Sequence, residues 1–148
     1  MSKLGLAIAI AAKAFENKTD KGGKPYILHC LWVMNKVRHL GEEVMIAAVL
    51  HDIVEDTNED SEINYTFAKL TELGFSDKVV GMLHLLTHDP NTPYDEYIKA
   101  ISVSRDAAEI KKADLEHNSN ITRLKGVRKK DFDRLEKYSR AFIYLSDL

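Results

Sequence analysis

Hydrophobic residues recur three and four positions apart along most of this chain, which is the spacing of the buried face of an α-helix. No segment alternates between polar and apolar residues for long enough to predict a strand. Capping residues, prolines and glycines divide the pattern into segments. We therefore predict one all-α domain over residues 1–148, with about seven or eight helices. The predicted helices cover approximately residues 2–16, 25–41, 42–57, 66–74, 76–87, 93–101, 105–124 and 131–145.

The third predicted helix carries four ionisable side chains in the otherwise apolar run over residues 47–57. A buried charge is costly unless it is paired or bound to a metal. In a continuous helix His51 and Glu55 would be one turn apart, and so would Asp52 and Asp56, so that the four span an arc of about 140°. They would then face one cavity, as a metal site beside an acid–base group. The alternative is a core histidine bonded to a carbonyl, with the carboxylates on the surface.

Two other predicted helices place metal-ligand side chains on their inward faces. His29 shares an apolar stripe with Val33 and Val37, and Asp114 shares one with Ile110. Two imidazoles and two carboxylates suit a divalent transition metal such as manganese, iron, cobalt or zinc. Such a set leaves coordination positions open for water and substrate. The candidate metal ligands are His29, His51, Asp52 and Asp114.

Composition and charge narrow the class of protein. A chain of 148 residues can bury a core without disulfides, and a net charge of −2 gives no drive toward nucleic acid or membrane, so we expect neither partner. Cys30 is the only cysteine, which excludes an intrachain disulfide and fits a reducing compartment, so we expect a cytoplasmic protein. The apolar stretch from Leu4 to Ala12 imitates a signal peptide, but its helical spacing favours an ordinary helix. No apolar run approaches the roughly 20 residues of a membrane span.

Three motifs, taken together, resemble those of a known enzyme family. They are Pro25-Tyr26-Ile27-Leu28-His29, Leu50-His51-Asp52-Ile53-Val54-Glu55-Asp56-Thr57 and Lys112-Ala113-Asp114-Leu115-Glu116-His117-Asn118. In order and spacing the chain is similar to HD-domain metal-dependent phosphohydrolases, and within them to the hydrolase domain of RelA/SpoT-type enzymes and their small stand-alone relatives. The resemblance implies an all-α fold that binds one divalent metal, typically manganese (Mn²⁺). It also implies removal of the 3′-diphosphate from guanosine alarmones, (p)ppGpp.

The resemblance also implies roles for individual residues. The implied metal ligands are His29, His51, Asp52 and Asp114. Glu55 and Asp56 would form the acid–base pair beside the metal. Asn118 would touch the sugar of the nucleotide, and Lys21 would face its phosphates or base.

Further candidates for substrate binding come from charge. Phosphate groups require nearby cations, and Lys24 and Arg123 lie in segments that flank the implied site. One position departs from the family pattern, because Asp20 stands where an arginine commonly packs on the guanine. A carboxylate at this position affects the prediction of a guanosine substrate more than the prediction of the metal site.

Two other functions are alternatives. The first is a 5′-nucleotidase of the same broad superfamily, which would release orthophosphate from nucleoside monophosphates rather than diphosphate. The second is a nucleotide-binding or partner-binding module without catalysis. A mere binding scaffold does not require Glu55 and Asp56, so their presence favours the enzyme. The sequence leaves the oligomeric state open.

Overall fold

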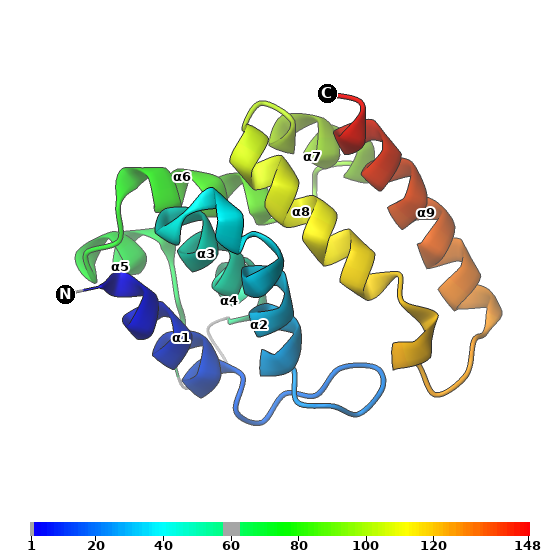
Figure 1. Cartoon of the computed structure of the whole chain (residues 1–148), viewed down its shortest axis with the longest axis horizontal. Coiled ribbons are helices and arrows are strands. Elements are labelled where there is room, and N and C mark those ends of the chain that lie inside the picture. The colour runs from blue at the N-terminus through cyan, green and yellow to red at the C-terminus, as the bar shows by residue number, and fades with distance from the viewer. Residues whose placement is uncertain (1, 58–62) are drawn as a thin grey trace.

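Helices account for the regular structure in the residues that the computed structural model describes, 2–57 and 63–148, apart from one isolated bridge between Thr19 and Pro25. The prediction of an all-α fold is confirmed (Figure 1). Two short 3-10 helices, η1 and η2, cover Arg38–Leu40 and Ile121–Arg123. The α-helices of these ranges are α1 (Lys3–Ala14), α2 (Ile27–Lys36), α3 (Glu42–Val49), α4 (Ile53–Asp56), α5 (Phe67–Glu72), α6 (Asp77–Leu86), α7 (Tyr94–Ile101), α8 (Arg105–Asn118) and α9 (Lys129–Ser146).

Helix α3 lies at the centre of the packing. It contacts α1, α2, α6 and α8, and its side chains from Ile46 to Val49 are all buried. A helix that is apolar on all sides is stable only when other helices surround it. Helix α9 packs against α8, and α1 lies at the opposite end of the molecule (Figure 1). The segment that follows α3 is therefore held on several sides.

The prediction of one continuous helix over residues 42–57 is wrong. Helix α3 ends at Val49, and α4 begins only at Ile53. Leu50 and Asp52 both have φ near −100° and ψ of 3°, a sparsely populated bridge conformation between helix and turn. The intervening turn, rather than helical periodicity, therefore sets the directions of His51 and Asp52.

Three predicted helix starts are confirmed by their caps. The side chains of Ser2, Thr66 and Ser76 each accept a hydrogen bond from a backbone N–H in the first turn of the helix that follows. The helix predicted over 105–124 is shorter, because α8 ends at Asn118 and the chain continues through η2. None of the helices in the described ranges combines the length and apolar character required to cross a bilayer.

Candidate metal and substrate site

Four side chains from three parts of the fold converge on one point. His29 comes from α2, His51 and Asp52 from the turn between α3 and α4, and Asp114 from α8. One nitrogen or oxygen atom from each lies within 4.8 Å of the corresponding atoms of the others. Asp52 is partly buried and the other three are buried. These are the four residues that the sequence nominates as metal ligands.

The two histidines face the carboxylates directly. His29 Nε2 lies 3.0 Å from Asp114 Oδ1, and His51 Nε2 lies 3.3 Å from the same oxygen. His51 Nε2 is also 3.0 Å from Asp52 Oδ2. The second nitrogen of His51, Nδ1, lies 2.7 Å from the Ala48 carbonyl oxygen, so the Nδ1–H donates there. His51 is thus bonded to a backbone carbonyl, as the interpretation of a core histidine expects. The bond uses Nδ1, so Nε2 still faces the cluster.

The chemistry of this donor set fits a cation. Burial alone would lower the pKa of His51, but the carboxylates of Asp52 and Asp114 raise it well above its usual range. The position beside His51 Nε2 is therefore favourable for positive charge, whether a proton or a metal ion. Two carboxylates in a buried site are costly without such a charge. Oxygen and imidazole nitrogen ligands together suit manganese, iron, cobalt or zinc.

Three neighbouring side chains hold the carboxylates in place. The Tyr26 hydroxyl donates a short hydrogen bond to Asp52 Oδ2. Lys111 Nζ lies 2.9 Å from Asp114 Oδ2, and Asn118 Nδ2 donates to Asp114 Oδ1 at 2.9 Å. Burial would raise the pKa of Asp114, but the Lys111 ammonium and the two histidines hold it well below its usual range. Asp114 therefore remains an ionised, oriented carboxylate.

A stack of three rings supports His29 from the side opposite the cluster. His29 Nδ1 lies 2.7 Å from His117 Nδ1, and the two rings are nearly parallel with centroids 5.0 Å apart. Trp32 continues the stack, with its ring centroid 4.3 Å from that of His117. Burial, Arg123 and His29 lower the pKa of His117 to about 4, so His117 is a neutral acceptor for the His29 Nδ1–H. That bond leaves His29 Nε2 available to a metal.

Helix α4 places the two carboxylates of the predicted acid–base pair against different partners. Asp56 Oδ2 is 2.8 Å from Lys18 Nζ, and Glu55 Oε1 accepts a hydrogen bond of 2.8 Å from the His88 backbone N–H. Burial raises the pKa of both carboxyls, and the nearby Asp52 charge raises them further, against the effects of Lys18 and the His88 N–H. Raised carboxyl pKa values suit groups that exchange protons near neutral pH.

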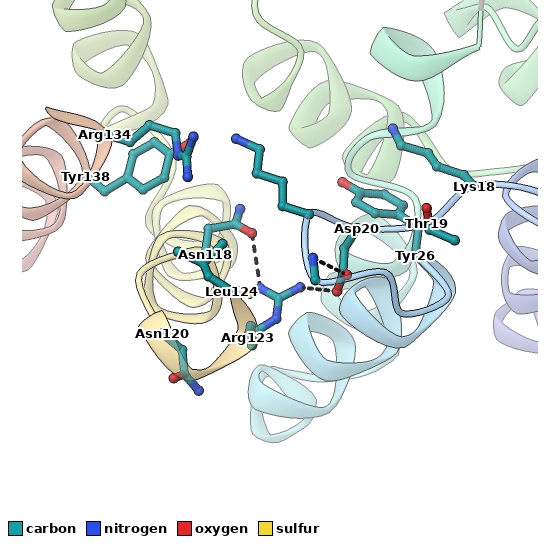
Figure 2. A pocket seen from close by; sticks show the side chains of 12 residues that line it. Lys18, Thr19, Asp20, Tyr26, Asn118, Asn120, Arg123, Leu124, Arg134 and Tyr138 are labelled. Atoms are coloured by element: carbon teal, nitrogen blue, oxygen red, sulfur yellow. Dashed lines mark hydrogen bonds and ion pairs between the residues drawn. The ribbon is translucent and has the colours of Figure 1, made fainter. Parts of the chain in front are cut away.

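A cavity of about 280 Å³ opens beside the cluster (Figure 2). Tyr26 and Asn118, which bond the two carboxylates of the cluster, lie in its wall, so the cavity and the cluster are adjacent. The full lining is Lys18, Thr19, Asp20, Lys21, Gly22, Tyr26, Asn118, Asn120, Arg123, Leu124, Arg134 and Tyr138. Of the predicted substrate-binding residues, it includes Lys21, Asn118 and Arg123. Lys24 lies outside this lining and is exposed.

Asp20 and Arg123 join the two sides of this cavity. Arg123 Nη2 lies 3.1 Å from Asp20 Oδ2, and Arg123 Nη1 donates to the His117 carbonyl at 2.8 Å and to Asn118 Oδ1 at 3.3 Å (Figure 2). The other Asp20 oxygen accepts the backbone N–H groups of Gly22 and Lys24, both at 2.9 Å. The Asp20 carboxylate thus pairs with an arginine that lies 103 positions away in the sequence, and this pair forms part of the cavity wall.

Sequence reasoning did not identify Tyr26, Lys111 and His117 as partners of the cluster. Each lies three residues from a predicted ligand on the same turn of chain, Tyr26 from His29 and the other two from Asp114. For Lys111, which bonds Asp114 itself, this spacing was an available signal, because side chains three apart on a helix are neighbours. Tyr26 and His117 instead bond Asp52 and His29, and no spacing relates those pairs. The pairing of Asp20 with Arg123 had no such signal, because it joins two distant loops.

Comparison with known proteins identifies relatives of the whole fold and of its first half. The profile of a family described as HD domain matches residues 7–84. A probable GTP pyrophosphokinase of Mycobacterium leprae is 37% identical over 75 residues, which are 49% of this chain and 9% of that protein. A guanosine-3′,5′-bis(diphosphate) 3′-pyrophosphohydrolase of Haemophilus influenzae is 42% identical over 50 residues, 32% of this chain and 7% of that protein. The chain thus spans less than a tenth of the length of these curated relatives.

A solved structure supports the fold over nearly the full length. The structure of a metazoan orthologue of SpoT that hydrolyses ppGpp matches with a TM-score of 0.75. The match covers 98% of this chain and 85% of that one, at 22% sequence identity. The helical arrangement is therefore shared by the two proteins.

Proposed function

The chain belongs to the HD domain family, and from this premise we propose that it is a metal-dependent phosphohydrolase of nucleotides whose substrate is a guanosine alarmone, (p)ppGpp, cleaved at its 3′-diphosphate. One observation carries the proposal. Four side chains of metal-ligand type converge directly beside a cavity that is lined by several lysine and arginine side chains. The combination of a metal position and an anion-binding cavity is what hydrolysis of a phosphate ester requires.

His29, His51, Asp52 and Asp114 would hold one divalent metal ion, which we take to be Mn²⁺. A divalent ion in such a site polarises a phosphoryl oxygen and lowers the pKa of a coordinated water. The side chains around the ion orient its ligands. Lys111, Asn118 and Tyr26 fix the orientation of the two carboxylates, as outer partners of metal ligands commonly do.

The remaining residues have roles that follow from their positions. Glu55 and Asp56 exchange protons with the attacking water and the leaving group. Asn118 contacts the ribose, and Lys21 and Arg123 bind the substrate from opposite walls of the cavity. Asp20 positions Arg123 through the ion pair between them. Lys24, which is exposed at the edge of the loop, attracts the anionic substrate rather than contacting it in the cavity.

The choice of an alarmone is supported by the names of the relatives. The Haemophilus influenzae protein is a pyrophosphohydrolase of guanosine 3′,5′-bis(diphosphate), and the metazoan structure is that of an enzyme that hydrolyses ppGpp. The match to the metazoan structure covers 98% of this chain and so includes the residues of the cluster. The names of both relatives favour a 3′-diphosphate over a simple 5′-monophosphate as the group that is cleaved.

Turnover by the purified chain tests the proposal. The substrates are ppGpp and the common nucleoside mono- and triphosphates, each with added Mn²⁺. Asp52→Asn removes one charge from the cluster, and Glu72→Ala, at an exposed site on α5, is the matched control. We expect diphosphate release from ppGpp that is lost only in Asp52→Asn. Orthophosphate release from monophosphates alone would identify a 5′-nucleotidase, and tight nucleotide binding without turnover would identify a binding module.

A further inference from the structure

A second groove adjoins the substrate cavity at the connection between α8 and α9. Its volume is about 310 Å³. Lys21, Leu124 and Arg134 line both this groove and the first cavity, so the two are continuous. The groove is lined by Lys21, Leu124, Lys125, Gly126, Arg128, Lys130, Asp131 and Arg134. We call it the basic groove.

The basic groove concentrates positive charge in a chain whose net charge is −2. Five of its lining residues are cationic and one, Asp131, is anionic. Asp131 is already engaged, because it forms a short ion pair with Arg134 and accepts the Arg128 backbone N–H at 2.8 Å. Among the described residues, the side chains of Lys21, Lys125 and Lys130 have no carboxylate within ion-pair distance. The groove therefore carries an excess of uncompensated cations.

The position of these cations is unfavourable for the stability of the helix. Arg128 is the N-cap of α9, and Lys129 and Lys130 occupy its first turn. The N-terminus of a helix carries partial positive charge, so basic residues there are destabilising and an anion is stabilising. Burial and the nearby Arg134, Lys130 and Lys137 also lower the pKa of Lys21, with only Asp131 acting in the opposite direction. A bound anion would relieve both effects.

We propose that the basic groove binds the 5′-phosphates of the nucleotide whose 3′-diphosphate lies at the metal cluster. The inference rests on the proposed function, and it adds a second subsite formed by Lys125, Arg128 and Lys130. The nucleoside spans the first cavity, between Tyr26 and Asn118 on the cluster side and Lys21 and Arg134 on the groove side. Affinity then increases with the number of 5′-phosphates on the substrate.

A small phosphorylated ligand fits the groove better than a nucleic acid does. The groove has a volume of about 310 Å³ and is continuous with a cavity of about 280 Å³. Its lining holds no aromatic ring on which successive bases could stack. Phosphate groups, by contrast, are recognised by clustered lysine and arginine side chains and by helix N-termini.

Equilibrium binding to the full chain tests the groove separately from catalysis. GMP, GDP and GTP are titrated without added metal, because they lack a 3′-phosphate and differ only in their 5′-phosphates. The variant is Lys125→Ala/Lys130→Ala, and the charge-matched control is Arg38→Ala/Lys99→Ala, at exposed positions elsewhere. We expect Kd to fall on the order of tenfold from GMP to GTP in the unmodified chain and in the control, because each added phosphate gains charge-assisted contacts. The double variant should lose most of this gain from GMP to GTP.

Other results would overturn the inference. Equal Kd values for the three nucleotides, or an equal loss in variant and control, would exclude a 5′-phosphate subsite. Binding of a single-stranded RNA that depends on Lys125 and Lys130, with no gain from GMP to GTP, would assign the groove to nucleic acid instead. If ppGpp is not turned over but affinity still rises from GMP to GTP, the proposed function is refuted while the phosphate-binding groove is retained. The two failures are therefore distinguishable.

Discussion

Replacement of His117 by phenylalanine tests the ring stack behind the candidate metal site. Phenylalanine keeps an aromatic ring between His29 and Trp32, but it removes the nitrogen that accepts the His29 Nδ1–H at 2.7 Å. The side chain of His29 is fully buried, so this N–H would have no water to bond instead. The substitution therefore isolates a single hydrogen bond.

The magnitude follows from two separate arguments. A buried donor left without an acceptor costs about 1–3 kcal/mol, which corresponds to roughly 5- to 150-fold in an equilibrium constant. Outer partners of metal-binding histidines contribute about 10- to 100-fold to metal affinity, which lies within that range. We therefore expect His117→Phe to weaken Mn²⁺ binding by about 10- to 100-fold.

The assay is a calorimetric Mn²⁺ titration, with the fluorescence of Trp32, the single tryptophan, as a second readout. His117→Asn is the matched variant, because its amide oxygen can occupy the position of Nδ1 and accept the same hydrogen bond. We expect it to retain most of the affinity. Equal affinity of His117→Phe and the unmodified chain, or equal losses in the two variants, would refute the reasoning. Urea unfolding of each variant verifies that the fold is intact.

Three further predictions concern the cavity and the core. Hydrogen bonds from Lys24 N–H and Arg123 outweigh burial and hold the pKa of Asp20 below its ordinary 3.8, so Asp20 contributes stability that is present above pH 3.8 and lost as the pH falls through its lower folded value. Asp20→Asn should thus lower the free energy of unfolding by about 1 kcal/mol at pH 7, and by progressively less as the pH falls below 3.8, as measured by urea unfolding. A Cβ on Gly22 would lie 2.0 Å from the Arg123 carbonyl oxygen, so Gly22→Ala should raise KM severalfold in steady-state kinetics and leave Mn²⁺ affinity unchanged. Ile110→Ala should destabilise the fold by about 2–5 kcal/mol in urea unfolding.

Most of the helices, and the inward direction of two of the four cluster residues, could be predicted because they depend on local spacing. Ser2, Thr66 and Ser76 are residue types that favour helix N-caps, and in the structure each of the three side chains caps a helix. His29 and Asp114 lie among apolar neighbours at helical spacing, which predicts that they face the core. Both are buried in the structure and lie within the cluster.

The break between α3 and α4 could not be predicted in the same way. The run over residues 47–57 contains no glycine or proline, so local propensity favours one continuous helix. The turn is accompanied by one contact with another element, because the Asp52 carboxylate accepts a hydrogen bond from the Tyr26 hydroxyl, and by one local contact, from His51 Nδ1 to the Ala48 carbonyl. Tertiary contacts such as that between Asp52 and Tyr26 routinely override propensity. The arc of the four ionisable residues, derived for a continuous helix, was therefore wrong even though His51 and Asp52 do meet.

Residues of the candidate metal site and residues of the cavity beside it differ in how far sequence can identify them. His29 and Asp114 lie on helices, where a side chain's direction follows from its position along the chain, whereas His51 and Asp52 lie in a turn next to a predicted helix. The cavity wall is built from two loops, and its defining contact, Asp20 with Arg123, joins residues 103 positions apart. No periodicity relates such positions. A single sequence can therefore indicate the chemistry of this family more readily than the substrate that a particular member prefers.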